Sequence, residues 1–213
     1  MMAEPTDRAG TTPWISRLGP WLLVGGLVLF HAVNNWLWLE ENVTSTGWDK
    51  PRHLAHSLSY TQMLSSPTLR SLFSVMTADS IRPPLFPASA APMYWLFGRS
   101  ADVAVMVNIV YMAIVLAATY GLGRRWGGQR QGMVGVALLA TFPMFYSMSR
   151  YFYLEFALTA MVALTMYLLL ATDGFQKPWI SLLFGVCLGL GLLTKRTFAL
   201  FVVGPVFAVI LSS

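Results

Sequence analysis

The stretch LGPWLLVGGLVLFHAVNNWLWL, residues 18–39, decides the fold class. A helix of this length would measure roughly 33 Å, which is enough to cross the hydrocarbon core of a bilayer. Trp36 and Trp38 at its far end suit an aromatic belt at the membrane interface. The run is too long for a signal-peptide core and lacks a convincing small-residue cleavage site. We therefore expect a retained membrane span.

The composition of the whole chain agrees with this expectation. Of the 213 residues, 56% are hydrophobic and only 11% are charged, whereas soluble domains carry about a quarter charged residues. The sequence therefore predicts an all-α polytopic membrane protein. The net charge of +5 is no argument for nucleic-acid binding, and no C2H2, RNP-like or Walker motif is present. The lone cysteine, Cys187, cannot form an internal disulfide.

Further apolar runs predict five more spans, separated from the first by a long polar loop over residues 40–99. Within this loop, residues 52–64 and 67–78 are helix candidates, and residues 85–97 are expected at the membrane interface because prolines interrupt them. We expect residues 1–17 to be a disordered cytoplasmic tail. The sequence stops in or just after the sixth span, which suggests an N-terminal fragment whose C-terminal remainder is absent. The later spans are expected at about 103–122, 133–148, 153–171, 179–193 and 198–213.

The distribution of arginines predicts the orientation of the spans. Arg124, Arg125 and Arg130 fall in one short loop without an acid, which is typical of a cytoplasmic loop. The N-terminus then lies in the cytoplasm as well. By parity, the 40–99 loop, the turn at Arg150 and the turn at Lys195 meet on the extracytoplasmic face of a plasma membrane, which we expect to be a bacterial inner membrane.

Arg82-Pro83-Pro84-Leu85 is the most distinctive segment of the outer loop. Two consecutive prolines disfavour helix immediately before them and stiffen the chain where the cation lies. A fixed cation at headgroup level suits a phosphate. The alternative is a proline-rich turn with a single snorkelling arginine.

Asp49, Arg52 and His53 lie near the start of the first helix candidate, with His56 one turn further along the same face. Asp49 is a candidate general base, although its carboxylate would serve equally well as a helix cap. Two histidines three residues apart without a third ligand are a weak metal signal, and solvated or hydrogen-bonded histidines explain them better. The sequence therefore predicts no metal site and leaves dependence on a divalent metal open.

Two further charged positions fall in the short outer turns. Glu155 opens the fourth span, where a carboxylate tends to be paired or functional. A snorkelling acid, or a pair with Arg150, would also explain it. Lys195 and Arg196 place two cations on the outer face, against the usual charge bias, so they need an anion. Membrane lipid phosphates alone would satisfy them.

Taken in order, these motifs resemble those of the GT-C glycosyltransferases of the protein O-mannosyltransferase and aminoarabinose-transferase group, a family 39-like type. An acidic outer-loop motif of the Asp-Glu-x-Arg-Tyr kind is matched by residues 49–53, with lysine and histidine at its second and fifth places. A Lys-Pro-Pro-Leu motif is matched by residues 82–85, with arginine first. Residues 123–125 match Gly-Arg-Arg, and residues 193–195 match the start of a Leu-Thr-Lys-Gly-Pro turn. Arg150 and Glu155 match a later turn in which aspartate is the common acid.

The resemblance implies a GT-C-like transmembrane bundle with a long helical first outer loop. It also implies transfer of a sugar from a polyprenyl-phosphate-linked donor to a protein, lipid or glycan acceptor. Asp49 would be the catalytic base, and Glu155 would assist it or position the acceptor. Arg52, Arg82 and Lys195 would hold the donor phosphate, and the accessory positions would be His53, Arg150 and Arg196. The rival hypothesis is a non-enzymatic transporter or a protein that binds anionic lipid.

Overall fold

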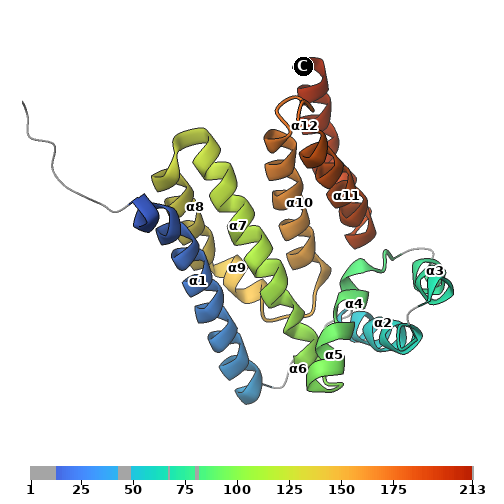
Figure 1. The fold of residues 1–213 in the computed structure, drawn as a ribbon. Coiled ribbons are helices and arrows are strands. Elements are labelled where there is room, and N and C mark those ends of the chain that lie inside the picture. Colours follow the sequence, from blue (N-terminus) through green and yellow to red (C-terminus); the bar gives the residue numbers. More distant parts are fainter. Residues whose placement is uncertain (1–12, 43–48, 67, 80–81, 213) are drawn as a thin grey trace, which may run out of the picture.

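The computed structural model describes residues 13–42, 49–66, 68–79 and 82–212 of the chain (Figure 1). Within these residues the secondary structure is helical, and no strand is present. Three helical stretches are long and apolar enough to cross a membrane, namely Leu18–Glu41, Ala101–Gly127 and Leu154–Ala171. Two shorter apolar helices follow them. The expectation of an all-α membrane protein is therefore confirmed.

Successive long helices of the bundle run in opposite directions (Figure 1). α7 (Val107–Gly127) packs against α1 (Pro13–Glu41), α8 (Gln129–Thr141) and α10 (Leu154–Ala171). α10 in turn packs against α11 (Pro178–Thr194) and α12 (Phe198–Ser212). Because the chain reverses at each turn, the end of α1, the start of α10 and the α11–α12 turn lie at the same end of the bundle.

The third apolar segment differs from the single span expected over about 133–148. α8 ends at Thr141, Phe142 is extended with φ −69° and ψ 123°, and the short helix α9 (Pro143–Met148) follows. Pro143 explains the break, because a proline disfavours the helical conformation in the residue before it and is well suited to the first turn of a new helix. The segment expected as the third span therefore consists of two helices joined at Phe142.

Two helix ends also differ from the expectation. α1 begins at Pro13, so residues 13–17 are helical, and only residues 1–12 of the expected tail lie outside the described residues. Proline suits a first helical position because its φ is already fixed and its missing N–H is not needed there. α7 continues to Gly127, which places Arg124 and Arg125 in its last turn and not in a loop. Cations at that position interact favourably with the helix dipole.

The segment between α1 and α7 forms a helical layer at one end of the bundle (Figure 1). It consists of α2 (Lys50–Met63), α3 (Leu69–Thr77), α4 (Leu85–Ser89) and α5 (Ala91–Phe97), and α6 (Ala101–Val105) leads from it into α7. Phe86 of α4 is fully buried and stacks on Phe152 with ring centroids 4.4 Å apart, so the first half of the expected interfacial segment packs on the bundle. The hydroxyls of Tyr94 and Ser57 lie 2.8 Å apart and join α5 to α2.

Candidate functional site

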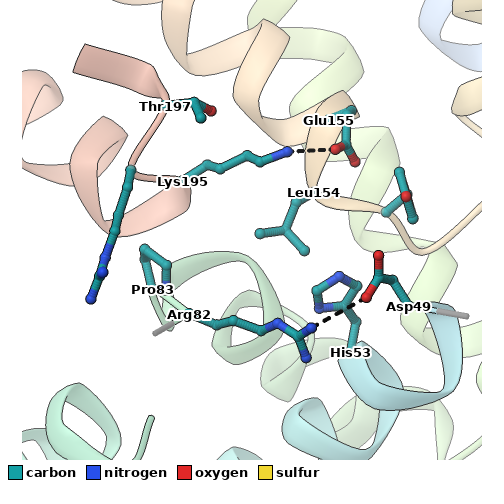
Figure 2. Close-up of a pocket in the computed structure, with 10 residues that line it drawn as sticks. Asp49, His53, Arg82, Pro83, Leu154, Glu155, Lys195 and Thr197 are labelled. Carbon is teal, nitrogen blue, oxygen red and sulfur yellow. Dashed lines mark hydrogen bonds and ion pairs between the residues drawn. The ribbon is translucent and has the colours of Figure 1, made fainter. Parts of the chain in front are cut away.

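A cavity of about 230 Å³ lies where this helical layer meets the bundle (Figure 2). Four separate parts of the chain form it: the start of α2, the turn before α4, the start of α10 and the α11–α12 turn. We call it the ion-pair cavity. Its lining residues are Asp49, His53, Arg82, Pro83, Tyr153, Leu154, Glu155, Lys195, Arg196 and Thr197.

The first ion pair joins Asp49 to Arg82. Nη2 of Arg82 donates to Oδ1 of Asp49 at 3.2 Å, although 33 residues separate them (Figure 2). Asp49 occupies the position before α2, but its side chain makes no capping hydrogen bond. The carboxylate therefore faces a cation from another part of the loop, and the capping alternative does not describe its contacts.

Asp79 positions Arg82 in the turn before α4. Its Oδ1 accepts a hydrogen bond from the backbone N–H of Arg82 at 3.1 Å, and its Oδ2 lies 3.7 Å from Nδ1 of His56. An aspartate that accepts from the backbone further along the chain stabilises a turn. Nη1 of Arg82 is buried and has no hydrogen-bond partner within the described residues. The guanidinium therefore keeps donor capacity beyond its bond to Asp49.

The second ion pair joins Glu155 to Lys195. Nζ of Lys195 donates to Oε1 of Glu155 at 2.6 Å across 40 residues (Figure 2). Glu155 lies in the first turn of α10, and Lys195 follows the last residue of α11. The glycine at 191 lets the α11–α12 turn close tightly, because a Cβ there would collide with the Phe198 ring. The structure thus pairs Glu155 with Lys195 and not with Arg150.

His53 places a neutral ring beside the first pair. Its side chain is buried, and desolvation lowers its pKa from 6.5 to about 4; the positive charge of Arg82 acts in the same direction, and the negative charge of Asp49 opposes it. The imidazole is therefore uncharged at neutral pH. Its ring meets that of Tyr153 edge to face, with centroids 6.2 Å apart.

The carboxylates of the cavity are arranged as ion pairs. Within the described residues, no group of three or more histidine, cysteine, aspartate or glutamate side chains is arranged to hold an ion. Both cavity carboxylates face cations, which would oppose a divalent metal.

Three further residues were expected in the site, namely Arg52, Arg150 and Arg196. Arg196 lines the cavity, whereas Arg52 and Arg150 do not. Arg52 is exposed on α2. Arg150 donates from Nε to Oδ1 of Asn35 at 3.2 Å, and its guanidinium lies 4.1 Å from the centroid of the Tyr146 ring. Arg150 therefore fastens α9 to α1.

Sequence reasoning missed the buried polar contacts that hold the segment leading to Glu155. Nδ2 of Asn35 donates to Oγ of Ser149 at 3.0 Å, and Nδ2 of Asn108 donates to the carbonyl of Tyr151 at 2.8 Å. Nζ of Lys50 lies 3.5 Å from the centroid of the Tyr151 ring, so the residue that departs from the acidic motif ties α2 to the same segment. Amide side chains inside apolar spans, which tend to find partners, were the available signal.

The fold and the cavity define an all-α membrane protein with paired charges at one end of its bundle. A family model described as dolichyl-phosphate-mannose-protein mannosyltransferase matches residues 81–213. The chain belongs to this family and is a membrane glycosyltransferase. Comparison with curated proteins and with solved structures returns no significant match.

Proposed function

We propose that the ion-pair cavity transfers a sugar from a polyprenyl-phosphate-linked donor to a hydroxyl of a protein, lipid or glycan acceptor. The observation that carries this proposal is that two carboxylates, each paired with a cation, meet in one cavity formed by four distant parts of the chain. Glycosyl transfer from a phosphate needs both kinds of group. A carboxylate can accept the proton of the acceptor, and cations can stabilise the departing phosphate.

Each charged side chain has a role in the proposed step. The acceptor oxygen attacks the anomeric carbon, the bond from that carbon to the phosphate oxygen breaks, and the hydroxyl proton moves to Asp49. Polyprenyl phosphate leaves with the electron pair of the broken bond, and Arg82 and Lys195 balance its charge. Glu155 positions the acceptor beside Asp49. A direct displacement of this kind inverts the configuration at the sugar carbon.

The donor, and the side of the membrane that the cavity faces, are inferred from two features. The family description names a dolichyl-phosphate-mannose donor and a protein acceptor, which supports a lipid-linked sugar as the donor. The cavity lies at the end of the bundle opposite Arg124 and Arg125, which close α7. If those arginines mark the cytoplasmic side of a plasma membrane, the N-terminus is cytoplasmic and the cavity faces outward.

The rival function is a transporter or an anionic-lipid-binding protein without chemistry. Such a protein would need Arg82 and Lys195, but it would not need a carboxylate beside the bound phosphate. Asp49 lies in the same cavity as both cations, and its side chain is free of any capping bond. This arrangement favours transfer over binding alone.

The test uses Asp49→Asn in the full-length protein, reconstituted in liposomes with a radiolabelled polyprenyl-phosphate sugar. We expect turnover to fall by about 10²- to 10⁴-fold, the usual contribution of a general base, while donor binding is retained. The matched control is Asp173→Asn, because Asp173 pairs with Lys177 far from the cavity and asparagine tolerates its positive φ. Unchanged turnover in the Asp49 variant would overturn the base assignment.

A further inference from the structure

A second hollow runs along α7 toward the C-terminal end of that helix. Its volume is about 640 Å³, within the usual range of ligand sites, and α1, α7 and α10 form its sides. Leu164 and Tyr167 contribute from α10, nine and twelve residues after Glu155. At 1.5 Å per residue these positions lie roughly 14 to 18 Å along the helix from the ion-pair cavity. The two hollows therefore lie at different heights along the bundle. We call this one the arginine groove.

Small residues of α7 form the floor of the arginine groove. Ala113, Ala117 and Gly121 recur every four residues and so share one face of the helix. Tyr167 lies directly against this face, since a Cβ on Gly121 would collide with its ring. The floor is thus an apolar channel along a helix that is long enough to cross a membrane.

An aromatic pair forms the wall of the groove on the α1 side. The rings of Trp21 and Tyr120 meet edge to face, with centroids 5.5 Å apart. Tyr120 is buried, whereas Trp21 is half exposed. Such a wall presents apolar surface to an occupant, and indole and phenol rings favour the interface between hydrocarbon and headgroups.

Arg124 and Arg125 stand at the mouth of the groove. Both line it, both are exposed, and both lie in the last turn of α7, at the end of a membrane-length helix. The ion pairs of the described residues leave both of them without an acidic partner. Two cations without an acid, at the end of an apolar channel, complement a ligand that has one anionic end and one apolar chain.

We propose that the arginine groove binds an anionic phospholipid of the surrounding leaflet. Its acyl chain lies along Ala113 and Ala117 and against the Tyr167 ring that covers Gly121, and its phosphate contacts Arg124 and Arg125. This site is separate from the ion-pair cavity and takes no part in the transfer reaction. It gives the chain a preference for anionic over zwitterionic lipid at this end of the bundle.

The experiment measures lipid retention on the purified protein by native mass spectrometry, with phosphatidylglycerol and phosphatidylcholine of identical acyl chains. We expect preferential retention of phosphatidylglycerol. The double variant Arg124→Gln/Arg125→Gln should weaken it by about tenfold or more, because each cation near a membrane surface contributes appreciably to anionic-lipid affinity. Arg130→Gln is the matched control, since Arg130 lies near the start of α8 and outside the groove.

A second variant tests the channel independently of charge. Ala117→Phe should fill the floor and lower retention of phosphatidylglycerol to a similar degree, whereas Val110→Phe, on an exposed part of α7 outside the groove, should not. Equal retention of both lipids would overturn the proposal. So would full retention in either groove variant, which would indicate adsorption elsewhere. A dimer that Ala117→Phe dissociates would identify a second copy of the chain as the occupant instead.

Discussion

The two ends of the bundle differ in whether their cations pair with carboxylates. In the ion-pair cavity each pairing cation meets a carboxylate of the chain, Arg82 with Asp49 at 3.2 Å and Lys195 with Glu155 at 2.6 Å. In the arginine groove, Arg124 and Arg125 pair with no acid of the described residues. Cations alone can hold an anion, but moving a proton requires an acceptor as well. Under the two proposals, this difference separates an end of the bundle that carries out chemistry from an end that only binds.

The largest effect expected after that of Asp49→Asn concerns Arg82. Arg82→Ala should weaken donor binding by about ten- to a hundredfold, because hydrogen bonds to charged groups typically contribute 1.5–3 kcal/mol. The measurement is the equilibrium affinity for the lipid-linked sugar in detergent micelles. Arg125→Ala, in the arginine groove, is the matched control and should leave this affinity unchanged. If the affinity of the Arg82 variant for the lipid-linked sugar is unchanged, Arg82 does not hold the donor phosphate. The proposed difference between the two ends of the bundle would then be weaker.

An intermediate effect is expected from His53, whose pKa in the folded protein is lowered to about 4. Between pH 4 and 6.5 the unfolded chain binds the additional proton, so the free energy of unfolding rises with pH in this window. Acidification from pH 6.5 to 5 should therefore cost roughly 1.5 kcal/mol. His53→Asn should remove this part of the pH dependence in thermal unfolding, and His56→Asn on the same helix provides the comparison. An unaltered slope in the His53 variant would contradict the burial argument.

The smallest effect should come from breaking the second ion pair. The side chains of Lys195 and Glu155 are 32% and 42% exposed, and pairs in such surroundings contribute little to stability. A double-mutant cycle with Lys195→Met and Glu155→Gln should give a coupling below about 1 kcal/mol in the free energy of unfolding. A coupling of several kcal/mol would make the pair a structural brace and weaken its assignment to the site.

Much of the arrangement follows from sequence because a membrane restricts the possible topologies. Apolar runs long enough to span fix the helices, and parity then brings distant turns to the same end of the bundle. This is why Asp49, Arg82, Glu155 and Lys195 could be grouped before any coordinates, and the structure places all four in one cavity. The orientation of that end relative to the cytoplasm stays a prediction.

Sequence could not supply the pairing partners, because they depend on how the turns fold at close range. Glu155 is five residues from Arg150 yet pairs with Lys195, since Arg150 is held by Asn35 of α1. Similarly, the apolar character of Phe86 fits a membrane interface as well as a protein core. Only its stacking on Phe152 settles the choice.

The Asp49–Arg82 pair has a consequence for the order of events at the cavity. A donor phosphate that binds Arg82 competes with the carboxylate that already holds Nη2 of its guanidinium. A phosphate that displaces the carboxylate from the guanidinium frees Oδ1 of Asp49 for the acceptor hydroxyl. Under the proposed function, loading the donor and freeing the base are then a single exchange of partners at Arg82, and without donor Oδ1 of Asp49 stays bonded to the guanidinium.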